Sequence, residues 1–136
     1  VQAGLCDVAI GNTYYMAAML KNPEQKAWAE SVRIVFPNAA DRGTHVNISG
    51  MALAANAPNK AAAEKLMAYL VSPAAQKIYA EGNSEYPVVP GVDATELVTS
   101  WGELKSDSLA LTEIARLRKE ASELVDKVQF DAGPGS

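Results

Sequence analysis

The sequence is poor in the residues that build disulfides, zinc sites and histidine-based catalytic sites. Its 136 residues include one cysteine, Cys6, and one histidine, His45. One cysteine excludes an internal disulfide, and neither residue has the clustered partners that a structural zinc site needs. A single histidine also leaves no convincing Ser-His-Asp or Cys-His arrangement. We therefore do not expect an enzyme, and we expect Cys6 to be a small buried hydrophobe and His45 to have a structural or solvent-facing role.

Positive charge and long apolar runs are also scarce. The chain has 12 basic and 16 acidic residues, a formal net charge of -4, and 49% hydrophobic residues. This balance gives no positive field to collect phosphate groups, so a nucleic-acid partner is not expected. No apolar run approaches the roughly 20 residues needed to cross a bilayer, so membrane insertion is not expected either. The hydrophobic content is enough for a packed core.

Strand and helix patterns alternate along the first half, which is typical of an α/β fold with short strands and many helices. Short strands are expected at residues 6–10, 32–36 and 46–54. A helix is expected from Asn12 to about Lys21, with the Asn12 side-chain oxygen accepting hydrogen bonds from the first turn. Asn22 and Pro23 predict the start of a second helix, because proline is well tolerated at the first helical position.

The second half is mostly helical. Asn59 is expected to cap one helix, and Ser72-Pro73 to start another that Gly82 ends. From about Ser108, apolar residues recur at three- and four-residue spacing and predict the longest amphipathic helix of the chain. So few strands with so many amphipathic helices predict apolar faces that stay uncovered unless another chain or copy covers them.

Two adjacent phenols, Tyr14 and Tyr15, follow the first predicted strand at the turn into a helix. Ligand sites of α/β proteins lie outside the carboxyl ends of strands, and a helix N-terminus favours anions. The two rings leave the helix about 100° apart, yet both can reach one cation beyond its end. A bound cation displaces the phenol proton, which makes phenolate a hard oxygen ligand. The residues alone leave open a plainer reading, in which one ring packs in the core and the other lies on the surface.

Residues 4–15, which end in Gly-Asn-Thr-Tyr-Tyr, resemble the dityrosine segment of the ferric-ion-binding proteins, the soluble receptors of bacterial ABC iron importers. Further segments resemble the C-terminal half of the same family, in the same order and at similar spacing. They are Phe36-Pro37 and residues 43–50, 70–76 and 83–88.

The resemblance implies part of a two-lobed type II periplasmic-binding-protein fold that closes over a metal in its cleft. Tyr14 and Tyr15 match the two phenolate ligands, and Asn12 matches a position that contacts the anion in some members. It further implies Fe³⁺ with a synergistic anion, phosphate or carbonate, a periplasmic location and delivery to an ABC permease. Other family ligands, often a histidine and a carboxylate, come from a first half that is not in this sequence.

The family layout also divides the chain. It implies a second-lobe segment with the Tyr-Tyr turn at 1–45, a crossover strand at 46–54, helices packing on the first lobe at 55–92, and a C-terminal helical segment at 93–131. The ending Gly-Pro-Gly-Ser itself reads like a linker or expression scar, at 132–136. The implied partner is the missing N-terminal half or another copy of the chain. One rival function is binding of a sugar, polyamine or organic anion. The other is an enzyme using Tyr14 or Tyr15 as acid or base, although no basic group adjoins them.

Overall fold

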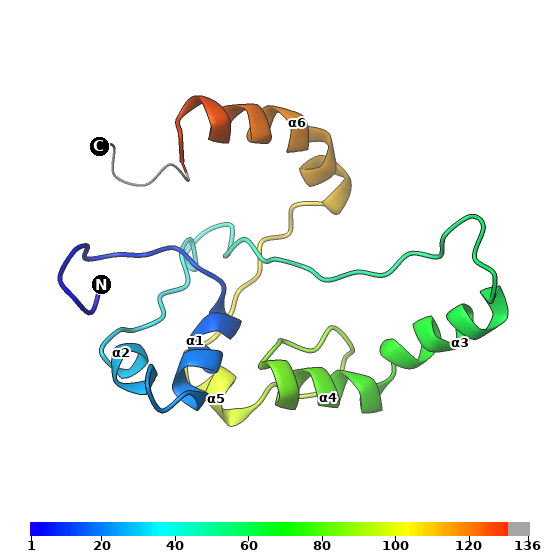
Figure 1. The fold of residues 1–136 in the computed structure, drawn as a ribbon, viewed down its shortest axis with the longest axis horizontal. Helices are drawn as coiled ribbons and strands as arrows, with labels where there is room; N and C mark the ends of the chain where they lie inside the picture. The colour runs from blue at the N-terminus through cyan, green and yellow to red at the C-terminus, as the bar shows by residue number, and fades with distance from the viewer. Residues whose placement is uncertain (131–136) are drawn as a thin grey trace.

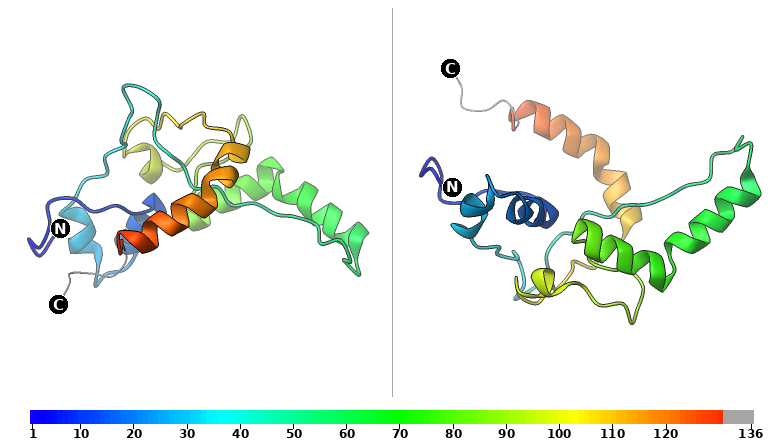
Figure 2. Two further views of the ribbon diagram at one scale, coloured as in Figure 1. Left: turned by 90° about the horizontal axis from the view of Figure 1, so that it is seen from above. Right: turned by 60° about the horizontal axis from the view of Figure 1, so that its bottom comes forward.

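In the computed structural model, residues 1–130 are described, and they form helices joined by long extended segments (Figure 1). The expected scar at 132–136 lies outside the described residues. The helices are α1 (Thr13–Lys21), α2 (Lys26–Glu30), α3 (Lys60–Leu70), α4 (Pro73–Asn83), α5 (Glu96–Thr99) and α6 (Leu111–Lys127). Helices α1 and α2 pack together, α4 contacts both α1 and α3, and α6 stands apart in both Figure 1 and the right view of Figure 2.

Two of the predicted helices follow local sequence rules closely. Ser72 caps α4 by accepting a hydrogen bond from the backbone N–H of Ala75 at 3.3 Å, and Pro73 occupies the first turn. Helix α6 is the longest helix among the described residues, as its apolar spacing predicts. Helix α4 runs one residue beyond the predicted end at Gly82, because Ser84 takes the left-handed conformation (φ 57°) that closes a helix.

The predicted start of the second helix was wrong. The Asn22 side-chain oxygen accepts from the backbone N–H of Glu24 at 3.0 Å, and its carbonyl accepts from Gln25 and Lys26. These bonds make a turn after α1, so α2 begins only at Lys26. Asn59 lies at the N-cap of α3 as predicted, but its side chain makes no capping hydrogen bond.

The three predicted strands, 6–10, 32–36 and 46–54, are extended but unpaired within residues 1–130. A strand exists only when a neighbour satisfies its backbone groups, and nothing in the described part of the chain lies beside these segments as a partner. These three segments have strand-like sequences but are extended chain in the structure, and most of their residues are exposed.

One isolated parallel bridge, between Thr44 and Ser106, joins the two segments that lead to α3 and α6. The Thr44 N–H donates to the carbonyl of Lys105 at 2.7 Å, and the Asp107 N–H donates to the carbonyl of Thr44 at 2.8 Å. Gly43 makes this close approach possible: its φ is +95°, and an added Cβ would stand 2.7 Å from the Ser106 oxygen. The bridge fixes where these two extended segments meet.

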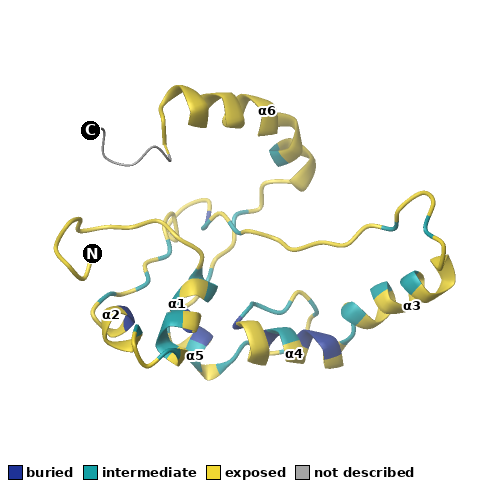
Figure 3. Ribbon diagram, viewed as in Figure 1, coloured by how far each residue is buried: buried dark blue, intermediate teal, exposed yellow. Residues whose placement is uncertain are grey.

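Burial is shallow throughout (Figure 3). The buried apolar residues are mostly small: Ala17, Ala29, Ala75, Ala80 and Val98. Many large apolar side chains are exposed instead, especially on the extended segments and α6, which confirms the expectation of uncovered apolar faces. Cys6 is exposed and not buried as predicted, because nothing covers its extended segment; His45 is exposed, as expected.

Among residues 1–130, no helix combines the length and the apolar character that a membrane span requires.

Candidate functional site

The start of α1 brings two phenols together. The ring centroids of Tyr14 and Tyr15 are 4.5 Å apart, with their planes tilted by 56°. Tyr15 is 58% exposed and Tyr14 is half-buried, so both are open to a solute or ion. The rings stay close in spite of their different directions from the helix axis. This placement favours the reading in which both side chains act at one site over the one in which a ring is lost to the core.

Asn12 precedes the helix in extended conformation (φ −80°, ψ 142°), as a cap residue should. The predicted capping bond was wrong, however: its side chain makes no bond to the first-turn N–H groups. The amide nitrogen Nδ2 instead donates to the Tyr14 hydroxyl oxygen at 3.0 Å. Asn12 therefore holds the Tyr14 phenol, and no capping side chain occupies the first turn of α1. The anion-attracting end of the helix lies beside the two rings.

The environment raises the pKa of Tyr14 above the ordinary value of 10.0. The neighbouring Tyr15 hydroxyl is the main cause, partial desolvation adds to it, and the negative charge of Glu85 adds a smaller contribution. The hydrogen bond from Asn12 acts in the opposite direction. At neutral pH the Tyr14 phenol consequently keeps its proton until a cation displaces it.

Glu85 is near enough to Tyr14 for its negative charge to act on the phenol, and sequence reasoning missed it. Its carboxylate accepts from Asn83 Nδ2 at 3.1 Å, just after α4. The loop is held by the buried Gln76, whose side-chain oxygen accepts from the Val88 N–H at 2.9 Å. Glu85 lies 71 positions after Tyr14 in the sequence, and no local signal predicts that its charge acts on the Tyr14 phenol.

The described residues offer no alternative metal centre of the common kind. Among residues 1–130 no three or more His, Cys, Asp or Glu side chains gather to hold an ion. The oxygen donors available at the start of α1 are the hydroxyl groups of Tyr14 and Tyr15, which are 4.5 Å apart between ring centroids.

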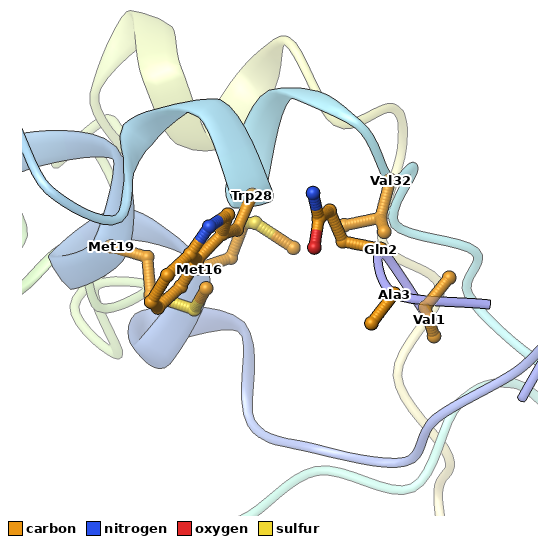
Figure 4. Close-up of a pocket in the computed structure, with 7 residues that line it drawn as sticks. All are labelled: Val1, Gln2, Ala3, Met16, Met19, Trp28 and Val32. Atoms are coloured by element: carbon orange, nitrogen blue, oxygen red, sulfur yellow. The ribbon is translucent and has the colours of Figure 1, made fainter. Parts of the chain in front are cut away.

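An apolar hollow of about 450 Å³ is lined by side chains of α1 and α2 and by the N-terminal residues (Figure 4). Trp28, Met16 and Met19 gather on one side of it, and the N-terminal residues and Val32 lie opposite. These side chains contribute no hard anionic oxygen, so this hollow is not the candidate ion site.

Comparison with known proteins decides the family. The family model of the bacterial extracellular solute-binding proteins matches residues 8–106, most of the chain and all of the Tyr-Tyr turn. The chain belongs to this family. The solute-binding proteins are binding proteins, in line with the expectation that the chain is not an enzyme.

Relatives within the family are iron proteins by name. Iron uptake protein A2 of Synechocystis sp. is 41% identical over 132 residues, 94% of this chain and 38% of that protein. The ferric iron-binding protein A of Mannheimia haemolytica, solved in an open conformation, is 48% identical with a TM-score of 0.88; the match covers 96% of this chain and 41% of that one. A Trichodesmium protein solved in complex with iron and citrate ligands is 46% identical, with a TM-score of 0.87 over 94% of this chain and 41% of that one.

These matches confirm the expected fold class: the chain has the fold of part of a type II periplasmic binding protein. The chain spans about two fifths of the length of the relatives that it matches. The unpaired extended segments and exposed apolar faces are what such a partial fold presents.

Proposed function

We propose that this chain is the C-terminal part of a periplasmic ferric-ion-binding protein that carries Fe³⁺ to an ABC permease. In this proposal Tyr14 and Tyr15 bind the ion as phenolates. Asn12 orients a synergistic anion, phosphate or carbonate. The observation that carries the proposal is the pair of open phenol rings 4.5 Å apart at the start of α1, within a chain of the solute-binding family.

The chemistry suits a hard, highly charged cation. Two phenolates bring two negative charges to Fe³⁺, and one positive charge remains for an anion to balance. The positive end of α1 favours the phenolates and the anion alike. The Asn12 amide, which donates to the Tyr14 oxygen, is a neutral donor of the kind that also stabilises a bound oxyanion.

Two protein oxygens do not complete the coordination of Fe³⁺. We propose that the remaining ligands come from the N-terminal part of a two-lobed protein, with 1–45 in the second lobe, 46–54 as the crossover strand, 55–92 on the first lobe and 93–131 as the C-terminal helical segment. The exposed apolar faces and the unpaired extended segments support this layout, because both need a partner.

The names of the relatives agree with iron as cargo. Iron uptake protein A2 and the ferric iron-binding protein of Mannheimia share the matched region with this chain. The Trichodesmium structure contains citrate, so a carboxylate anion is the third candidate beside phosphate and carbonate.

The test is a ferric titration of the whole two-lobed protein in the presence of phosphate, carbonate or citrate, followed by visible absorption. Phenolate coordinated to Fe³⁺ absorbs visible light, whereas a complex with a sugar, polyamine or organic anion does not. We expect a visible band that saturates at one ion per protein, strengthened by one of the three anions. Iron uptake without that band would refute tyrosine coordination, and tight binding of a metal-free solute would favour the rival function.

A further inference from the structure

The carboxyl end of α4 lies beside α1, the helix that carries the tyrosines (Figures 1 and 2). Two contacts fix the chain at this place. The Lys21 Nζ donates to the carbonyl of Glu81 at 3.5 Å and to the carbonyl of Gly82 at 3.3 Å. The buried Gln76 donates from Nε2 to a carbonyl at 2.8 Å and accepts from the Val88 N–H at 2.9 Å. The short stretch between these two contacts is therefore held near α1.

This stretch carries a carboxylate that no cation neutralises. Glu85 is half-buried, and its Oε1 accepts from Asn83 Nδ2 at 3.1 Å. Within residues 1–130, no basic side chain forms a salt bridge with it. Its negative charge acts on the Tyr14 phenol at the start of α1. A partly buried charge is screened less than a fully exposed one, so a charged solute bound at this turn also experiences it.

The anion proposed to accompany Fe³⁺ lies next to the same phenol. Asn12, the residue proposed to orient that anion, donates to the Tyr14 hydroxyl oxygen at 3.0 Å. An anion at Asn12 and the carboxylate of Glu85 are therefore both neighbours of Tyr14. Like charges so placed repel each other, and the repulsion grows in proportion to the charge of the anion.

We propose that Glu85 is a specificity-determining residue of the ferric site, whose carboxylate weakens binding of the accompanying anion, and more strongly the higher the charge of that anion. The inference rests on the proposed function, because the anion accompanies an ion held by Tyr14 and Tyr15. Glu85 need not touch the ion or the anion, since its charge acts through space. The site consequently favours phosphate over citrate more than it would without this carboxylate.

The experiment measures the dissociation constants of phosphate and of citrate from the whole protein loaded with Fe³⁺ and dialysed free of anions. Anion binding is followed by the shift of the visible band, at anion concentrations that leave the iron bound. Glu85→Gln removes the charge and keeps an oxygen that can accept from Asn83, whereas Glu85→Asp keeps the charge. Glu81→Gln is the matched control, because Glu81 is exposed at the same end of α4 and pairs with Lys77 at 3.8 Å.

We expect Glu85→Gln to bind phosphate about threefold more tightly than the parent, a size that partly exposed charge pairs reach. Near neutral pH phosphate carries about two negative charges and citrate about three, so the gain for citrate should be about fivefold. Both gains should vanish between about 0.01 M and 1 M sodium perchlorate, as the Debye length falls from about 30 Å to about 3 Å. Glu85→Asp and Glu81→Gln should stay close to the parent values.

Unchanged anion affinities in Glu85→Gln, a gain that persists at high salt, or a gain no larger for citrate than for phosphate would overturn the role of Glu85. Salt separates a charge effect from a structural one, because a rearranged loop would alter anion binding at every ionic strength. A parent protein that takes up Fe³⁺ without the visible band would refute the proposed function and this inference with it. A parent with the band and a Glu85→Gln variant with parental anion affinities would refute the role of Glu85 alone.

Discussion

The variant Tyr14→Phe tests the role of Tyr14 as a phenolate ligand through the pH dependence of iron binding. The pKa of the Tyr14 phenol lies above 10.0, chiefly because of Tyr15. At pH 7 a phenol with such a pKa is ionised in fewer than about one molecule in a thousand. Iron binding to Tyr14 must therefore release one proton, and phenylalanine at this position has no proton to release.

The size of the effect follows from that one proton. The ratio of parent affinity to Tyr14→Phe affinity should fall about tenfold for each unit that the pH is lowered between roughly pH 8 and 6. The sign follows from competition between protons and Fe³⁺ for the Tyr14 oxygen. Lower pH weakens ferric binding at this oxygen in the parent, whereas the variant has no oxygen there to lose.

The assay is competition for Fe³⁺ with one chelator at several pH values, on parent and variant in parallel. The pH dependence of the chelator and of ferric hydrolysis is common to both proteins and cancels in the ratio. Tyr69→Phe, which changes an exposed tyrosine on α3, is the control and should keep a constant ratio to the parent. A parent-to-Tyr14→Phe ratio that does not vary with pH would refute proton displacement at Tyr14.

Two further predictions concern the scaffold and are measured by denaturant unfolding of the whole protein. Gly43→Ala should lower the free energy of unfolding by about 1–3 kcal/mol, because Gly43 has φ +95° and an added Cβ would stand 2.7 Å from a carbonyl oxygen. The control Gly50→Ala, whose added Cβ meets nothing within 4 Å, should lie within about 0.5 kcal/mol of the parent. Equal losses in the two variants would contradict the close approach at Gly43. Ser72→Ala should lower the free energy of unfolding by about 1 kcal/mol, because it removes the cap on α4. Asn59→Ala should lower it clearly less, because the Asn59 side chain makes no capping bond. The reverse order would contradict the assignment of caps.

Features set by neighbouring residues could be predicted from the sequence. The start of α4 at Ser72-Pro73 needs only an oxygen near the first turn and a proline that has no N–H to lose, both local matters. The position of α6 was also predicted from its apolar spacing, which lies within one helix, although the helix begins at Leu111 and not at about Ser108. The Tyr14–Tyr15 pair could be singled out because the two residues are adjacent in the sequence at the start of a predicted helix, which the structure forms as α1.

Features that depend on distant residues could not be predicted. The extended segments have strand-like sequences, but pairing is a property of two strands, and the described chain provides no second one for them. The nearness of Glu85 to Tyr14 and the reach of Lys21 to Gly82 depend on how α1 docks on α4. Asn12 shows the same limit on a small scale: its Nδ2 donates to the Tyr14 hydroxyl, and its side-chain oxygen makes no capping bond.

The central claim is that iron is held by the two adjacent phenolates, and the most direct measurement is the visible band of the ferric protein in parent, Tyr14→Phe, Tyr15→Phe and Tyr69→Phe. We predict an intact band in the parent and in Tyr69→Phe, and a weakened and shifted band with lower affinity in each of the other two. An unchanged band in both Tyr14→Phe and Tyr15→Phe, or ferric binding by the parent without any band, would contradict the account.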